Sequence, residues 1–130
     1  MTRVLTILFL TLFCLTTHAE WLKLGTSPSG ETLYVDPASE QRYGNSVKVW
    51  AMYDHSRAEV FNGKSVYSVK DFYHINCLDQ TYRLLYQSAH SGRVGDGAVV
   101  NTFSKPEASW VPIAPASMID TLAYVLCKKR

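Results

Sequence analysis

Histidines, carboxylates and thiols are the side chains through which this sequence could carry out chemistry. His55, His74 and His90 stand far apart in the chain, and none forms a recognised catalytic signature with the aspartates scattered around it. Their spacing also lacks the short intervals at which histidines and cysteines bind a metal ion. The sequence therefore predicts a protein that is not an enzyme and that uses no metal or other cofactor.

Two cysteines predict a disulfide bond. Cys14 lies in the apolar N-terminal run, which leaves Cys77 and Cys127 in the rest of the chain. Two thiols that reach an oxidising compartment pair with each other. Closing a loop of this length stabilises a fold by roughly 4 kcal/mol, a large part of a typical domain's stability. Two independent free thiols are the alternative.

The N-terminus predicts export from the cytoplasm. Arg3 precedes an apolar run from Val4 to Leu15, and the segment ends in small residues at Ala19, where a signal peptidase would cleave. We therefore predict that residues 1–19 are a signal peptide and that residues 20–130 form a single domain. The apolar run is shorter than the roughly 20 residues that cross a bilayer as a helix.

The mature chain has a nearly balanced charge. Loss of Arg3 with the signal peptide reduces the basic side chains from 13 to 12, against 11 acidic ones, for a net charge of +1. Such a balance produces no broad positive field that would attract nucleic acid, so we predict no nucleic-acid partner. The mature chain contains no second long apolar stretch, so we also predict no transmembrane segment in it. A lipid anchor on Cys14 is an alternative, but bulky Phe13 stands where a small residue normally precedes a lipid-modified cysteine.

Period-two alternation and turn residues predict an antiparallel sheet of about five to six strands. Parity places Tyr82, Leu84 and Tyr86 on one side of their strand. In a longer strand, Asp71 interrupts an apolar side that ends at Cys77. The expected strands are Trp21–Leu24, Glu31–Asp36, Ser46–Tyr53, Lys64–Cys77, Tyr82–Ser88 and Ala98–Phe103.

A single helix is predicted at the C-terminus. Ser117 can cap the segment Met118–Cys127, whose apolar residues recur at helical spacing. Cys127 lies near the edge of this apolar stripe, where it can reach Cys77 on the apolar side of a strand. The predicted fold is therefore α+β, a single mostly antiparallel sheet with the C-terminal helix packed on one face and tied to a strand by the disulfide. The stripe consists of Ile119, Leu122, Ala123 and Leu126.

The sheet face away from the helix gathers aromatic and basic side chains, which together form a candidate surface for binding a partner. The alternative is that Trp50 and Phe72 pack beneath a loop such as residues 104–114, while the charged groups are solvated. Strand parity predicts that this face carries Lys48, Trp50, Lys70, Phe72, His74 and Arg83.

Short motifs spread over the mature chain resemble those of a known family. They are Trp21, Tyr34-Val-Asp36, Val47-Lys-Val-Trp50, Tyr67-Ser68 with Lys70, Cys77, Tyr82, and Trp110-Val-Pro-Ile-Ala-Pro115-Ala-Ser117 leading to Cys127. Together they resemble the surface-adhesin protein E family of Gram-negative bacteria. The resemblance implies a mostly antiparallel sheet with a helix fixed to it by a disulfide. For the adhesin that names the family, it also implies binding of host extracellular proteins such as vitronectin, laminin and plasminogen.

The expected function is therefore non-catalytic binding by a secreted or cell-envelope protein, located in the periplasm or at the outer surface. The expected partner is a protein, either a host extracellular matrix or serum protein, as the resemblance implies, or another envelope protein. The adhesin that names the family is held at the outer membrane by a lipid. The predicted signal peptide lacks a lipid-attachment sequence of the usual kind. A periplasmic binding or accessory module with no adhesive role is the alternative, because a fold does not fix a function.

Overall fold

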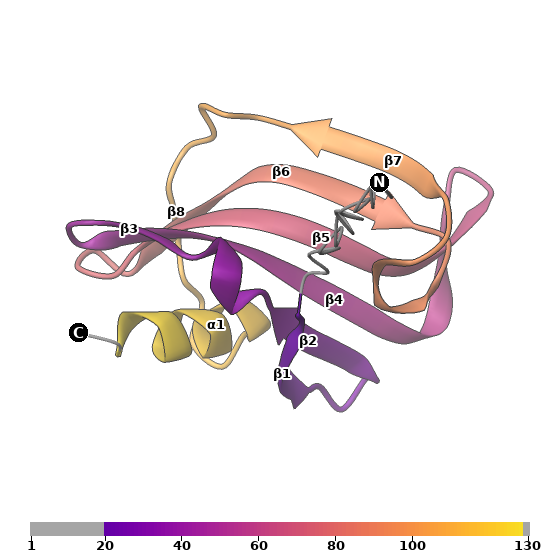
Figure 1. Ribbon diagram of the computed structural model, residues 1–130, viewed down its shortest axis with the longest axis horizontal. Coiled ribbons are helices and arrows are strands. Elements are labelled where there is room, and N and C mark those ends of the chain that lie inside the picture. The colour runs from indigo at the N-terminus through magenta and orange to yellow at the C-terminus, as the bar shows by residue number, and fades with distance from the viewer. Residues whose placement is uncertain (1–19, 129–130) are drawn as a thin grey trace, which may run out of the picture.

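A computed structural model describes residues 20–128, so the signal peptide predicted over residues 1–19 lies outside the described residues. In the described part, eight strands form a single sheet, accompanied by one α-helix and two short 3-10 helices (Figure 1). None of the helices within residues 20–128 has the length and apolar character needed to span a membrane. The strands are β1 (Leu22–Thr26), β2 (Glu31–Val35), β3 (Gln41–Tyr43), β4 (Ser46–Phe61), β5 (Lys64–Asn76), β6 (Thr81–His90), β7 (Val99–Ser104) and β8 (Val111–Pro112), and the helices are η1 (Pro37–Ser39), η2 (Arg93–Gly95) and α1 (Met118–Cys127).

The sheet is antiparallel, as predicted, with the strand order β1-β2-β4-β5-β6-β7; β3 also pairs with β4, and β8 with β6. The count of about five to six strands, which rested on alternation and turn residues, is wrong. It missed β3 and β8, because neither is long enough to show a period of two. β3 is exposed along its three residues, and β8 contains Pro112, which has no N–H to donate to a neighbouring strand.

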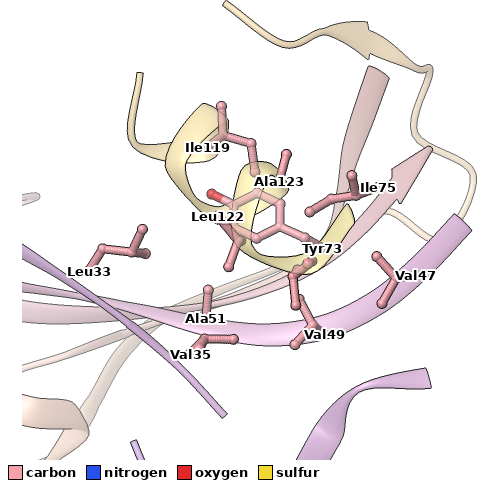
Figure 2. Close-up of a cluster of buried hydrophobic side chains, with 11 residues drawn as sticks. Leu33, Val35, Val47, Val49, Ala51, Tyr73, Ile75, Ile119, Leu122 and Ala123 are labelled. Carbon is pink, nitrogen blue, oxygen red and sulfur yellow. The ribbon is translucent and has the colours of Figure 1, made fainter. Parts of the chain in front are cut away.

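α1 packs against one side of the sheet, called the helix face below; the other side is called the open face. Alternation along β4 sends Val47, Val49 and Ala51 to the helix face, where they are completely buried. Figure 2 shows Leu122 and Ala123 of α1 over these strand residues. Burying one such side chain is worth roughly 1.5–3 kcal/mol, so the cluster fixes the helix on the sheet. The cluster consists of Leu33, Val35, Val47, Val49, Ala51, Tyr73, Ile75, Ile119, Leu122, Ala123 and Leu126.

Both ends of α1 are tied down. At the N-terminus, Ser117 Oγ accepts a hydrogen bond from the Asp120 N–H at 3.2 Å, which confirms the predicted cap. At the C-terminus, the Arg42 guanidinium of β3 donates to the Leu126 carbonyl. A disulfide joins Cys77, which follows β5, to Cys127 at the end of α1, with Cα atoms 5.6 Å apart. The predicted disulfide is therefore confirmed.

Candidate functional site

The open face carries the residues that parity predicts for it. β4, β5 and β6 are adjacent, and their register aligns Lys48, His74 and Arg83 in one row across the three strands. The next row on the same face aligns Trp50 with Phe72. The structure therefore brings the whole predicted set to one face, and its role in binding stays a prediction. The set is Lys48, Trp50, Lys70, Phe72, His74 and Arg83.

One parity prediction is wrong. Alternation predicts Tyr86 on the same side as Tyr82 and Leu84, but the register between β5 and β6 shifts by one residue at this point. A β-bulge of this kind reverses the side on which the following residues lie. Tyr86 therefore lies on the open face, where its ring meets the Trp50 ring edge-on with centroids 5.6 Å apart. Trp50 in turn stacks on Phe72 at 5.0 Å.

Trp110 covers one end of the open face. Its ring centre lies 4.5 Å from the guanidinium carbon of Arg83, and its centroid is 4.7 Å from that of His74. Burial, and then the charges of Arg83 and Lys48, lower the pKa of His74. The neutral ring can therefore accept a hydrogen bond at Nδ1 from Arg83 Nη2, 3.1 Å away. His74 and Arg83 are thus occupied with each other and with Trp110, from the segment expected to pack over this face.

The loop that contains η2 is fastened to the other end. Arg93 Nη2 lies 2.6 Å from Asp54 Oδ2, and the Val94 N–H donates to Asp54 Oδ1 at 2.7 Å. Burial acts to raise the pKa of Asp54, but these hydrogen bonds outweigh burial and hold that pKa below its ordinary value. The Gly95 N–H also donates to Ser68 Oγ at 2.8 Å. These contacts hold the loop rigidly against β4 and β5.

A pocket of about 280 Å³ opens on the open face, and its walls include two tryptophans and one lysine. Trp50 and Lys70 belong to the rows between that of His74 and that of Asp54, so the pocket lies between the two covered ends. Lys70 lies against Gly95, where an added Cβ would come within 2.4 Å of the lysine Cε. The η2 loop therefore positions the Lys70 side chain. The lining consists of Trp21, Asp36, Trp50, Lys70, Ser88 and His90.

Ser88 and His90 form a pair that resembles part of a catalytic site. Ser88 Oγ lies 2.9 Å from His90 Nε2, the contact that a serine nucleophile makes with its general base. In such sites an acid binds the other ring nitrogen and orients the imidazole. Here His90 Nδ1 is buried and has no hydrogen-bond partner among residues 20–128. The pair therefore lacks the third group that this mechanism needs.

The helix face carries its own polar cluster beyond the end of the apolar core. Asp71 is 3% exposed and accepts hydrogen bonds from Tyr73 Oη at 3.0 Å and from Gln87 Nε2 at 2.8 Å. Tyr53 Oη lies 3.0 Å from Tyr73 Oη. Burial raises the pKa of Asp71 to about 6, although the two hydrogen bonds act to lower it, and Glu31 adds to the increase. Asp71 therefore changes charge in the mildly acidic range.

One group of side chains could hold a metal ion. The ligand atoms of Glu31, His55 and Glu59 all lie within 4.8 Å of one another. His55 Nδ1 is 3.4 Å from the Glu31 carboxylate and 3.8 Å from that of Glu59, which is 68% exposed. These separations are ordinary for contacts between a histidine and carboxylates, and exposed acidic groups gather in this way without a metal.

Sequence reasoning missed four of the six residues that line the pocket. Ser88 and His90 follow Tyr86 beyond the bulge, so alternation assigned the end of β6 to the other face. Trp21 and Asp36 flank the paired residues Leu22 and Val35 of β1 and β2. Trp21 and Asp36 are adjacent because β1 and β2 pair as a hairpin, whose open ends lie side by side.

Comparison with known proteins agrees with this architecture. The sequence profile of the family described as Surface-adhesin protein E matches residues 21–128. The structure is similar to that of crystal form II of Haemophilus influenzae protein E, with a TM-score of 0.58 and 16% identity, covering 84% of this chain and 96% of that chain. It is also similar to protein E from non-typeable Haemophilus influenzae, with a TM-score of 0.58 and 13% identity, covering 85% of this chain and 77% of that chain. A search of curated proteins finds no match.

Proposed function

The chain belongs to the surface-adhesin protein E family, and from that premise we propose that it is a non-catalytic binding protein of the bacterial cell envelope. Its partner is another protein, and the binding surface is the open face of the sheet. The partners that the family suggests are host extracellular proteins, which would make the chain an adhesin. This role requires export through the predicted signal peptide of residues 1–19 and display at the outer surface.

The observation that carries this proposal is the pocket around Trp50. Tryptophan, tyrosine and arginine supply most of the binding energy in protein interfaces, and they act best when they are held rigidly. Trp50 is held between the rings of Phe72 and Tyr86, so it loses little side-chain freedom when a partner covers it. Lys70 is held beside it by Gly95. An ordered aromatic and cationic surface is therefore available between the two covered ends.

The test compares two double variants of the processed protein. Trp50→Ala with Lys70→Ala removes an aromatic ring and a lysine from the open face. Tyr124→Ala with Lys128→Ala removes the same two kinds of group from the solvent side of α1, where Lys128 Nζ lies 3.7 Å from the Tyr124 ring centre. We expect the first variant to bind immobilised vitronectin, laminin or plasminogen at least about tenfold more weakly, a change of about 1.4 kcal/mol. The control should bind like the unmodified protein.

Circular dichroism melting separates a loss of binding from a loss of folding. Unchanged binding by a folded Trp50 and Lys70 double variant would remove the open face as the binding surface. Equal weakening in the control would show that binding does not depend on this face. Absence of binding to all three host proteins, combined with capture of an envelope protein, would replace the adhesin with the second candidate.

That second candidate is a periplasmic binding or accessory module. It is favoured by Phe13, which precedes Cys14 and disfavours the lipid anchor that would hold the protein at the outer membrane. Cell fractionation and protease treatment of intact cells distinguish the two. An adhesin is cleaved on intact cells, whereas a periplasmic protein is cleaved only after the outer membrane is opened.

A further inference from the structure

We propose that the Trp50 pocket accepts an aromatic side chain of the partner that is flanked by carboxylates, so that the partner docks through an acidic segment containing one aromatic residue. This inference rests on the proposed function, because it names the chemistry of the protein that the open face would bind. It depends on the size of the pocket, on its hydrogen-bonding groups and on the charge of the surrounding face.

The pocket has the size of a side-chain site. Its volume of about 280 Å³ lies just below the range of about 300–1,000 Å³ that is typical of pockets for whole small molecules. Two tryptophans, Trp21 and Trp50, belong to its apolar wall. Rings stack well on rings, and offset or edge-to-face pairs contribute about 0.5–1.5 kcal/mol beyond the area that they bury. One aromatic side chain therefore fits the pocket in both volume and chemistry.

The pocket offers more hydrogen-bond donors than acceptors. Neither the indole N–H groups of Trp21 and Trp50 nor the Lys70 ammonium group has a hydrogen-bond partner among residues 20–128. Asp36 supplies the carboxylate of the pocket, and its Oδ1 already accepts the Ala38 N–H at 3.1 Å. A carboxylate accepts hydrogen bonds without donating any, and it is the natural partner of such a set.

His90 gives an independent sign that the pocket is incomplete. The residue is 6% exposed, it lines the pocket, and its Nδ1 has no hydrogen-bond partner among the described residues. A buried polar atom without a partner is rare, and a water molecule, an ion or another group bound nearby accounts for such atoms. Burial, and then the neighbouring ammonium of Lys70, lower the pKa of His90, which favours a neutral ring in the pocket wall.

The charges of the two faces favour an acidic partner. The open face presents Lys48, Lys70 and Arg83 against the single pocket carboxylate of Asp36, and the Asp54 carboxylate on this side is neutralised by its ion pair with Arg93. The helix face instead carries the carboxylates of Glu31, Glu59 and Asp71. An acidic segment is therefore attracted to the open face and repelled from the other, which fixes the side on which the partner docks.

The experiment uses three short peptides and the indole N–H signals of the processed, oxidised protein. The probe is acetyl-Glu-Tyr-Glu-amide; acetyl-Gln-Tyr-Gln-amide lacks the charge, and acetyl-Glu-Ala-Glu-amide lacks the ring. The three tryptophans of the sequence, Trp21, Trp50 and Trp110, give three signals in a nitrogen–proton correlation spectrum. We expect the probe to shift the signals of Trp21 and Trp50 and to leave that of Trp110 in place, because Trp110 lies at the covered end of the face.

We expect the probe to bind at least about fivefold more tightly than either matched peptide, a difference of about 1 kcal/mol. Lys70→Gln should reduce the preference for the charged peptide to less than about twofold, whereas Lys128→Gln, which removes a charge from the end of α1 on the other side of the sheet, should preserve it. Equal binding of the neutral peptide, a shift confined to Trp110, or no shift at millimolar peptide would overturn the proposal.

Failure of this inference differs from failure of the proposed function. If the probe does not bind while the Trp50 and Lys70 double variant still loses its protein partner, the open face is the binding surface and the acidic aromatic chemistry is wrong. If the probe binds while that double variant keeps its protein partner, the pocket chemistry is right and the proposed binding surface is wrong.

Discussion

The helix face and the open face are built from the same strands, yet they hold different kinds of side chain. On the helix face, aliphatic groups of β2, β4 and β5 are sealed beneath α1, and a disulfide closes the contact. On the open face, Trp50 and Lys70 line a pocket between two loops. Because successive residues of a strand point to opposite sides, one stretch of sequence can encode stability on one face and recognition on the other. Substitutions should therefore separate the two properties.

The largest effect is expected from breaking the helix face at its covalent link. Replacing Cys77 and Cys127 together with serine removes the crosslink across a sequence separation of 50 residues. We expect the free energy of unfolding to fall by about 4 kcal/mol, because the unfolded chain regains the entropy that the closed loop denied it. Urea unfolding followed by circular dichroism measures the change.

Reduction of the unmodified protein is the matched control for this variant. If the lost crosslink is the cause, reduction should lower the urea midpoint of the unmodified protein to that of the double serine variant. A loss of less than about 1 kcal/mol would mean that the aliphatic cluster alone holds α1 on the sheet. Peptide binding by the part of the variant that remains folded should be unchanged, because the pocket lies on the other face.

The second effect comes from Asp71, a buried carboxylate on the helix face. The pKa of Asp71 in the folded state, about 6, lies above its value of about 3.9 in an unfolded chain. The folded state therefore binds this proton more tightly, and stability is lost as the pH rises from about 4 through about 6. Asp71→Asn removes the charge and keeps one acceptor oxygen, which can bind Gln87 Nε2, while its amide group can donate to Tyr73 Oη. We expect it to stabilise the fold by about 1–3 kcal/mol at pH 7.5 and to have little effect at pH 4.

The measurement is urea unfolding of both proteins across this pH range, in which other titrating groups cancel from the difference. Glu31→Gln is the control, because Glu31 raises the pKa of Asp71 only as a secondary cause after burial. Its effect should be smaller than that of Asp71→Asn. A stabilisation by Asp71→Asn that stays constant from pH 4 to pH 7.5 would show that the pKa of Asp71 is the same in the folded and unfolded states, and hence that burial does not raise it.

The sequence predicted the helix face more completely than the open face, for a physical reason. Helical spacing and the cap at Ser117 gave α1 its observed bounds, because apolar periodicity reflects burial directly. Parity also predicted that Trp50 and Lys70 share one face, since both residues come before the β6 bulge in the chain. The bulge then moved Tyr86 to the open face without leaving any mark in the alternation. A pocket built across such an irregularity cannot be inferred from period alone.

The contacts made by the loops are a second feature that local sequence patterns do not predict. Arg93 reaches Asp54 across 39 residues of sequence, and Trp110 reaches Arg83 across a long connection. Neither contact follows from local pattern, because both depend on where a loop returns after the sheet has formed. The covered ends of the open face, and hence the position of its pocket, come from these long-range contacts.

The smallest effect is expected from Trp110, and it distinguishes the covered end of the open face from the pocket. Trp110 is 39% exposed, and its contact with the Arg83 guanidinium is worth about 0.5–1 kcal/mol, so Trp110→Ala should lower the free energy of unfolding by about that amount. Removing the ring also exposes His74, whose pKa is lowered first by burial, so that pKa should rise toward its ordinary value. An NMR titration of His74 between pH 4 and pH 8 measures the rise.

Trp110→Phe is the control, because it keeps a ring over His74 and should keep the pKa of His74 low. An unchanged His74 pKa in Trp110→Ala would show that Trp110 does not bury the histidine, and a loss of acidic-peptide binding would show that the covered end and the pocket act as one surface.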